Sequence, residues 1–550
     1  MKTITFKYLH LICTFIFILF IFHLSFSQSN MSIQWQGCYG GSEKDVAYDI
    51  CEYQANGYLI SGKTGSQDGD VSFLHGNKDI WLARIDSIGN ILWERSYGGS
   101  SYDMEGKIIQ ATDGNFYICG AVSSYDGDVQ SGNHGDYDVW VVKIDQDGEI
   151  IWEKCYGGSG REDFTNIKLL NNGNLLISCS STSDDGDLPA HYHAYDAWLF
   201  VISPYGEILK SAVFGNELHN NVYDAIETQD GGFFFTCGAS STEGMVEGTY
   251  HGGMLDIWVV KLDNNMNIEW QKLYGGSDFD SGSRGIIELL DGYIFLGVTN
   301  SNDQDVSGFH GGEGEDIWAV RIDTEGNIIW QRCLGGGDWE FTGDLHQTDD
   351  GGFIIFGSTL SHGGDVSGNN SWSGNSDIWI VKLSTEGELL WQECFGGYGN
   401  EGIIWGTIKK SDNNWVVAGW ADNNSYDVSC NLHGYKEDYW VFEIEDTSTN
   451  IINTQTTDNA IKVYPNPATD YVVFEFSSSV ISNCWAGQSV SVRNPPAIQI
   501  TNIFGQMMAE LPIKNEKTVW DIREVSGGTY FYCLQSGLNA IERGKIIILK

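Results

Sequence analysis

The chain is poor in basic residues, in proline and in long apolar runs. Of its 550 residues, 30 are Lys or Arg and 74 are Asp or Glu, which gives a formal charge of −44. Such a charge repels phosphate backbones and excludes a general nucleic-acid-binding role. Only 7 prolines stand beside 68 glycines, so stiff proline-rich linkers are scarce and glycine turns are plentiful. Beyond residues 9–24, no segment approaches the ~18 apolar residues of a membrane span.

The common catalytic signatures are also missing. The sequence contains no Gly-x-Ser-x-Gly elbow, no His-Glu-x-x-His helix and no glycine-rich phosphate loop. A glycosidase needs only two carboxylates at a set separation, and so many acids are present that some pair always qualifies. We therefore expect a non-catalytic protein, with a carbohydrate-active enzyme (a glycoside hydrolase or lyase) as the alternative.

The amino terminus is typical of an export signal. Lys2 and Lys7 precede an apolar run from Leu9 to Leu24, and small residues follow at Ser25 and Ser27. We expect residues 1–27 to be a signal peptide that is removed before Gln28; an uncleaved membrane anchor is the alternative. Residues 28–458 then hold 20 basic and 67 acidic residues, against 8 and 7 in residues 459–550. This step in charge marks a domain boundary.

Residues 28–446 repeat at intervals of 58–61 residues. One mark is an aspartate two residues before a tryptophan, in seven copies that begin at Asp79, Asp138, Asp196, Asp256, Asp316, Asp377 and Asp438. A second mark is a tryptophan before a glycine pair, at Trp35, Trp93, Trp152, Trp270, Trp330 and Trp391, with Lys210 in the remaining copy. The pattern of each unit predicts four antiparallel strands, with hairpin turns such as Asp113-Gly114 between the first two. Seven such units predict a seven-bladed β-propeller.

The phase of the repeat predicts how the ring closes. The body opens with a lone fourth strand, Ile33 to Tyr39, and ends on a third strand, Tyr439 to Ile444. An open array would leave the last sheet one strand short, with an exposed edge. We therefore expect the first strand to pair with the last and to complete the seventh blade.

The repeat resembles a known family. The run from Asp138 to Lys143, then Gly148 to Trp152 and Tyr156 to Ser159, is similar to the bacterial seven-bladed propeller repeat called SBBP. The resemblance covers residues 33–446 and departs most at Lys210 and at Gly215-Asn216. It implies an exported propeller and no particular reaction.

The C-terminal part resembles an export address. Residues 447–460 are Thr/Asn/Ser-rich and suit a linker. Residues 461–550 resemble the C-terminal sorting domain of the type IX secretion system of Bacteroidetes, a small β-sandwich. Its motifs are carried by Tyr464, Pro465, Asn466, Pro467, Gly505, Gly528 and Tyr530. The resemblance implies recognition by the secretion machinery and its surface sortase, and a location at the outer-membrane surface or outside the cell. Residues 477–498 depart from the family; we interpret them as a loop insertion, with a damaged domain as the alternative.

Acidic loops on one face of the ring are a candidate metal site. The loop between the second and third strands carries paired aspartates in several units: Asp68 and Asp70, Asp126 and Asp128, Asp185 and Asp187, and Asp303 and Asp305. Asp-Gly-Asp spacing can present oxygens to Ca²⁺. Aspartates also make turns by accepting hydrogen bonds from nearby backbone, and turn formation is the alternative.

Histidine recurs in the same loops. Six units carry one, three to six residues before the Asp-x-Trp aspartate: His75, His134, His193, His251, His310 and His433. One histidine for each unit is too few for a zinc site. We expect instead a repeated structural bond from histidine to aspartate or to backbone.

Departures from the repeat are candidates for function. Trp339, Trp372 and Trp420 lie outside the periodic positions, on expected face loops, with amides and carboxylates nearby. Exposed aromatic rings beside such groups can stack on sugars; additional core packing is the alternative. The cysteines share repeated positions, as Cys38, Cys155, Cys333 and Cys394 do, so we interpret them as small buried residues rather than a disulfide framework.

Together these patterns predict an all-β protein, a seven-bladed β-propeller followed by a small C-terminal β-sandwich. We expect an exported, monomeric binding or scaffold module whose partner is a glycan or a surface protein, with Ca²⁺ as the one candidate cofactor.

Overall fold

The computed structural model divides the chain into two compact units, residues 1–449 and 450–550. It describes residues 31–446 except 55–56, 190–194, 373 and 435. In the second unit it describes residues 461–464, 468, 471–476, 497–502, 507–512, 517–523, 525–526, 528–536 and 539–548. The expected signal peptide and linker lie outside these residues. In the part of the chain described, no helix has the length and apolar character needed to cross a bilayer.

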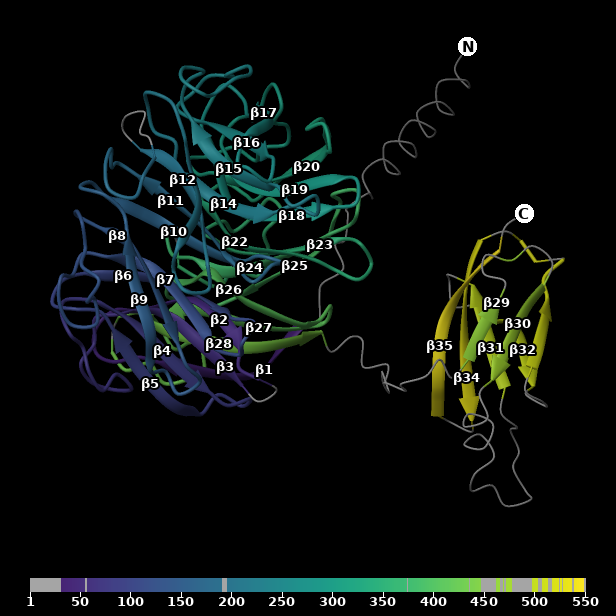
Figure 1. Ribbon diagram of the computed structural model, residues 1–550. Helices are drawn as coiled ribbons and strands as arrows, with labels where there is room; N and C mark the ends of the chain where they lie inside the picture. The colour runs from purple at the N-terminus through teal and green to yellow at the C-terminus, as the bar shows by residue number, and fades with distance from the viewer. Residues whose placement is uncertain are drawn as a thin grey trace, which may run out of the picture. The chain divides into compact units, whose positions relative to one another are not determined.

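Within its described residues, the first unit consists of seven four-stranded antiparallel sheets, the blades of a propeller (Figure 1). Six blades are consecutive in sequence. Blade 1 is β2 (Asp45–Glu52), β3 (Tyr58–Thr64), β4 (Asp79–Ile85) and β5 (Ile91–Tyr97); blade 2 is β6 (Asp103–Gln110), β7 (Phe116–Val122), β8 (Asp138–Ile144) and β9 (Ile150–Tyr156). Blade 3 is β10 (Glu162–Leu169), β11 (Leu175–Ser181), β12 (Asp196–Ile202) and β13 (Ile208–Phe214); blade 4 is β14 (Val222–Glu227), β15 (Phe233–Ala239), β16 (Asp256–Leu262) and β17 (Ile268–Tyr274). Blade 5 is β18 (Asp280–Leu289), β19 (Gly292–Thr299), β20 (Asp316–Asp323) and β21 (Ile328–Leu334); blade 6 is β22 (Glu340–Gln347), β23 (Phe353–Thr359), β24 (Asp377–Leu383) and β25 (Leu389–Phe395).

The seventh blade joins the two ends of the propeller. It consists of β26 (Glu401–Ser411), β27 (Asn414–Ala421), β28 (Asp438–Asp446) and β1 (Met31–Tyr39). The pairing of β1 with β28 runs from Met31 opposite Asp446 to Tyr39 opposite Tyr439. Contacts between the first strands of all successive blades, including β26 with β2, complete the ring. The prediction of a closed seven-bladed propeller is confirmed.

A disulfide bond corrects the interpretation of the cysteines. Cys38 on β1 is bonded to Cys430 in the loop between β27 and β28, with a Cα–Cα distance of 5.5 Å. Because Cys430 is off the repeated cysteine positions, a comparison of equivalent positions did not reveal its partner. Cys155, Cys333 and Cys394 are free and buried, as expected.

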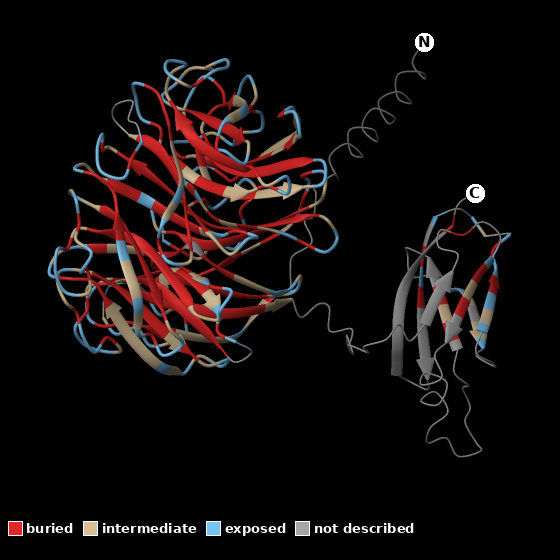
Figure 2. Ribbon diagram, viewed as in Figure 1, coloured by how far each residue is buried: buried red, intermediate tan, exposed pale blue. Residues whose placement is uncertain are grey.

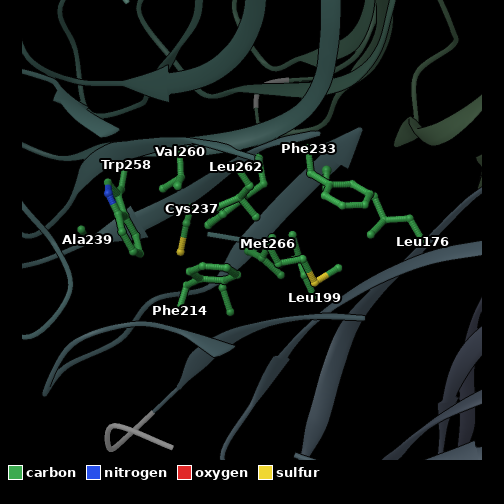
Figure 3. Packing of buried hydrophobic residues seen from close by; sticks show 14 of the residues in the cluster. Leu176, Leu199, Phe214, Phe233, Cys237, Ala239, Trp258, Val260, Leu262 and Met266 are labelled. Carbon is green, nitrogen blue, oxygen red and sulfur yellow. The ribbon is translucent and has the colours of Figure 1, made fainter. Parts of the chain in front are cut away.

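The cores lie between adjacent blades, where buried strands face one another (Figure 2). Figure 3 shows one of them, in which Leu176 and Leu199 of blade 3 pack with Phe233, Cys237 and Met266 of blade 4. The Asp-x-Trp tryptophans are fully buried. In each blade the indole N–H donates to a side chain on the fourth strand, as from Trp81 to Glu94 Oε2 at 2.8 Å. In blade 7, the composite blade formed by both ends of the propeller, Trp440 donates to Gln36 Oε1 at 3.1 Å. The strand β1 therefore makes the same bond as the fourth strand of the other blades.

The second unit contains two small sheets in its described segments. One consists of β29 (Ile461–Tyr464), β30 (Tyr471–Phe476) and β33 (Lys517–Asp521); the other of β31 (Ala497–Asn502), β32 (Met507–Pro512), β34 (Gly528–Ser536) and β35 (Asn539–Ile548). Phe474 and Trp520 of the first sheet share a core with Ile498, Tyr530 and Tyr532 of the second. The unit is therefore a small β-sandwich.

Candidate ligand site at the mouth of the central channel

The loops that follow the fourth strand and those between the second and third strands meet on one face of the propeller. In blade 1, Asp68 Oδ1 accepts the Ser42 N–H at 2.7 Å and Asp70 Oδ2 accepts the Gly40 N–H at 3.2 Å. Equivalent first-aspartate bonds join Asp126 to Ser100, Asp185 to Ser159 and Asp303 to Ser277. Equivalent second-aspartate bonds join Asp128 to Gly98, Asp187 to Gly157 and Asp305 to Gly275. The paired aspartates thus anchor the glycine-pair loops.

These carboxylates lie in separate blades. Among the described residues, no group of three or more His, Cys, Asp or Glu side chains is arranged to hold a metal ion. The hydrogen bond from the backbone N–H of Ser42 lowers the pKa of Asp68. Accepting a backbone hydrogen bond in this way is typical of a turn-forming aspartate. Calcium binding there stays a prediction, and a thermal melt with and without a chelator would test it.

The repeated histidines bridge neighbouring blades. His75 Nδ1 lies 2.8 Å from Asp79 Oδ2 in its own blade, and Nε2 lies 3.5 Å from Asp128 Oδ2 in the next. His251, His310 and His433 form the same bridge, with Nε2 to aspartate distances of 3.5, 3.5 and 3.4 Å. His134 makes the contact within its blade. The predicted structural bond is confirmed for these five, and His193 lies outside the described residues.

A ring of polar side chains surrounds the channel axis. It is formed by one position of the first strands: Asp49, Lys107, Asn166, Asp224, Arg284 and Asp344. Several reach into the next blade, as when Asp49 Oδ2 accepts the Ile108 N–H at 3.0 Å and Asp224 Oδ2 accepts the Gly285 N–H at 3.2 Å. Lys107 and Arg284 are interspersed among three aspartates, and Lys107 Nζ lies 3.4 Å from Asp49. These groups tie the inner strands together and largely neutralise one another.

A cavity of about 700 Å³ opens at the channel mouth, on the face of the acidic loops. Its aromatic walls are Phe164, Tyr223, Phe341 and Trp420, contributed by blades 3, 4, 6 and 7. The lining also contains Arg284 and Glu315, and burial raises the pKa of Glu315. The cavity therefore offers flat apolar walls and a small number of polar groups, which is typical of small-molecule sites.

Two glycines allow the aromatic walls to lie against the backbone. A Cβ at Gly402 would come 2.6 Å from the Trp420 ring, and one at Gly282 would come 2.6 Å from the Tyr223 ring. Any larger residue would push these rings out of place. The hydroxyl of Ser281 donates to the Tyr223 hydroxyl at 2.8 Å and orients it.

The structure separates the three candidate tryptophans. Trp420 lines the cavity. Trp339 is not among the lining residues, although its carbonyl accepts the N–H of Leu360, a lining residue, at 2.9 Å. Trp372 belongs to another cluster: its ring centroid lies 5.4 Å from that of Tyr398, which lies 4.7 Å from that of Tyr426.

Sequence patterns did not identify Tyr223, Phe341 and Arg284 as site residues. All three fall within first strands, where they looked like ordinary strand residues. The usable signal was their position, since each lies within four residues of the start of a strand that surrounds the channel axis. Blades 5 and 7 contribute Gly282 and Gly402 to the lining, which leaves space.

In the second unit, the described motif residues occupy strand ends. Tyr464 ends β29 and Gly528 begins β34 with a φ of 150°. Tyr530 is buried, and its hydroxyl donates to the Ser526 carbonyl at 2.8 Å. Pro465, Asn466, Pro467 and Gly505 lie outside the described residues, as do residues 477–496.

Comparison with known proteins agrees with this organisation. A family model described as a secretion system C-terminal sorting domain matches residues 462–549. The protein is therefore a secreted β-propeller protein, delivered to the cell surface or the extracellular space, and its tail implies interaction with the type IX secretion machinery.

Similar solved structures include a protein of unknown function from Dyadobacter fermentans DSM 18053, 9% identical, which covers 76% of this chain and 99% of that chain with a TM-score of 0.37. The Pan2 WD40 domain of Neurospora crassa is 10% identical and covers 77% and 97%, with a TM-score of 0.40. The polysaccharide lyase Uly1 is 10% identical and covers 74% and 91%, with a TM-score of 0.42. Regulatory protein FlaEY of Caulobacter vibrioides is 23% identical over 201 residues, 34% of this chain. The match spans 21% of the length of FlaEY.

Proposed function

We propose that the propeller is a non-catalytic binding module that holds a ligand with a flat apolar face, such as a sugar ring, at the channel mouth. The observation that carries this proposal is the cavity of about 700 Å³ walled by Tyr223, Phe341 and Trp420. Aromatic rings stack on the apolar faces of sugars, and Arg284 and Glu315 supply polar contacts that select among them. We further propose that the repeat is of the SBBP type.

The rival proposal is a carbohydrate-active enzyme. Glycoside hydrolysis generally requires two carboxyl groups on either side of the scissile bond. Among the described residues that line this cavity, Glu315 is the one carboxylic acid, which favours binding over hydrolysis. Release of reducing ends, or of unsaturated products, from a polysaccharide by the purified protein would support the rival instead.

A glycan array probed with the mature protein, followed by titration of the best ligand, tests the binding proposal. Trp420→Ala should weaken binding about 5- to 150-fold, since loss of one stacking ring costs about 1–3 kcal/mol. Trp372→Ala is the matched control, because that ring lies outside the cavity, and it should leave the affinity unchanged. Equal losses in both variants, or none in Trp420→Ala, would contradict the placement of the site.

Delivery is a separate part of the proposal. We propose that the surface sortase of the secretion system recognises residues 461–550 and that the mature propeller remains at the surface or is released. A strain that expresses the chain without residues 461–550 should retain the propeller in the periplasm. Detection of that truncated protein at the surface of intact cells would reject the assignment.

A further inference from the structure

The junction between blades 6 and 7 lacks the histidine that bridges four other junctions. Asn370 occupies its place, and the Asn370 N–H donates to Asp377 Oδ2 at 2.8 Å, as the histidine N–H does elsewhere. No side-chain hydrogen bond joins Asn370 to either aspartate within the part of the chain described. The bridge from Asp377 to Asp427, the equivalents of Asp79 and Asp128, is therefore missing.

Glu401, an acidic residue at this junction, has fewer partners than its equivalents in the other blades. Glu401 begins the first strand of blade 7, and both it and Asp377 are fully buried. Glu401 Oε1 has no hydrogen-bond partner among the described residues, whereas Asp377 Oδ1 shares this property with the Asp-x-Trp aspartates of blades 1, 2, 4, 5 and 7. The equivalent acid of blade 6, Glu340, accepts the hydroxyl of Thr359 at 2.6 Å, but Ala421 stands at that position in blade 7.

These carboxylates converge on one backbone segment. The Gly396 N–H donates to Asp427 Oδ2 at 3.2 Å. A Cβ at Gly396 would come 2.5 Å from Asp377 Oδ1 and 2.7 Å from Glu401 Oε2. Three carboxyl groups thus lie around Gly396 without the imidazole that contacts the equivalent aspartates at other junctions.

An exposed aromatic cluster lies beside the same junction. Trp372, Tyr398 and Tyr426 are 66%, 40% and 59% exposed, and the Tyr426 hydroxyl donates to the Tyr398 hydroxyl at 2.9 Å. Trp372 follows Asn370 by two residues, and Tyr426 precedes Asp427. Large aromatic side chains exposed together on a loop surface mark an interaction site, and aromatic faces attract cations.

A groove gives access from solvent. A cavity of about 680 Å³ runs along the outer side of blades 6 and 7, and its lining includes Asn370, Tyr426 and Asp427. The corresponding groove between blades 1 and 2 is lined by His75 and Asp128. A ligand that enters the groove of blades 6 and 7 therefore meets the position that histidine fills elsewhere.

We infer that this groove binds a nitrogen cation carrying N–H donors, an imidazolium or alkylammonium group presented by a partner molecule, between Asp377 and Asp427. The site is distinct from the channel mouth. The geometry of the other junctions defines the expected contacts: one N–H directed to each aspartate, with Tyr426 beside the ring or chain.

The test is a thermal melt of the mature protein with added imidazole or methylammonium, against sodium chloride at equal ionic strength. Wild-type protein should gain about 2–4 °C in melting temperature at saturation, because a ligand that binds only the folded state stabilises it by mass action. A gain with imidazole alone identifies a ring cation, and a gain with both identifies any N–H cation; each supports the inference.

Three variants locate the effect. Asn370→His supplies the missing imidazole from the chain itself, and should raise the melting temperature and abolish the response to added cation. Asp427→Asn should also abolish the response. Asp365→Asn is the matched control, because His310 already contacts Asp365, and it should respond as wild type does. No gain in wild-type protein, or an equal gain in wild type, Asn370→His and Asp427→Asn, would overturn the inference.

Discussion

The two sides of blade 7 differ sharply in how they are bonded. On the closing side, β1 is held by its pairing with β28 and by the Cys38–Cys430 disulfide. Toward blade 1, His433 bridges Asp438 and Asp70, and the Tyr39 hydroxyl donates to the Gly89 carbonyl at 2.6 Å. Toward blade 6, the histidine is missing and, among the described residues, the buried Glu401 Oε1 lacks the hydroxyl partner that its equivalent in blade 6 has.

This contrast indicates which bonds the fold requires and which it can omit. In blades 1–6 the fourth strand follows the third directly in the chain. In blade 7 the fourth strand comes from the other end of the propeller, and the Cys38–Cys430 disulfide supplies the covalent link that the chain does not. The junction with blade 6 needs no such replacement. The unsatisfied oxygen of Glu401 lowers stability, and such groups in native proteins are often retained for binding.

The largest expected effect concerns the disulfide. Cys38→Ser should lower the free energy of unfolding by about 4–5 kcal/mol, because the bond closes a very long loop of the unfolded chain. Urea denaturation under oxidising conditions measures this. Cys394→Ser, at the equivalent position of blade 6 with a free thiol, should cost about 1 kcal/mol. In reductant, wild type should fall to the stability of Cys38→Ser; an unchanged difference would show that the bond is not what stabilises the ring.

The next effect concerns pH at the junction with blade 6. Burial raises the pKa of Glu401 to about 8. The hydrogen bond from the Gly397 N–H lowers this pKa, and the charges of Asp377, Asp422 and Asp427 raise it. Since the folded pKa exceeds the unfolded one, the folded state binds more protons between about pH 4.5 and 8. The contribution of Glu401 protonation to the free energy of unfolding is therefore fully present below about pH 4.5 and is lost as pH rises through 8.

Glu401→Gln should flatten the resulting profile. At pH 8.5 the variant should be more stable than wild type by on the order of 2–3 kcal/mol, and the difference should shrink toward pH 5. Urea midpoints at both pH values measure the change. An Asp68→Asn variant is the control, because Asp68 is exposed and the hydrogen bond from the Ser42 N–H lowers the pKa of its carboxyl, so its effect on stability should not change between pH 5 and 8.5. A variant that remains less stable than wild type at pH 8.5 would show that Glu401 is not a destabilising charge.

A smaller effect is expected from the histidine bridge toward blade 1. His433→Ala leaves Asp438 and Asp70 without their common partner and should cost about 1–3 kcal/mol, the penalty for unsatisfied buried acceptors. Thermal melts at pH 6.5 compare it with His362→Ala, which removes an exposed histidine and should change stability by less than ~0.5 kcal/mol. Equal effects would mean that the bridge carries no stability of its own.

The smallest effect concerns the ion pair between Lys436 and Glu43, which also joins blade 7 to blade 1. Both side chains are about half exposed, at 50% and 55%. Such pairs are screened by water and salt, so Lys436→Ala should change stability by less than ~0.5 kcal/mol. A loss above ~1 kcal/mol in a urea titration at low salt would place this pair among the real closing contacts.

The repeat alone predicted the ring, because its phase left one strand unpaired at each end and only closure satisfies both. It predicted the histidine bonds because a residue that recurs in the same loop of most units is expected to have a structural role in each blade. It could not predict the bond from Cys38 to Cys430, since one partner lies outside the repeat. Nor could it place Trp420 with Tyr223 and Phe341, because they meet only around the channel axis, where first strands from distant parts of the sequence converge.

The composite blade also ties completion of the fold to the order of synthesis. Gln36 is made early, yet the indole that it binds, that of Trp440, is 404 residues away. A product that terminates before β28 cannot close the ring, and it also lacks the export tail that follows β28. Any molecule that carries the tail therefore contains every strand that the ring needs.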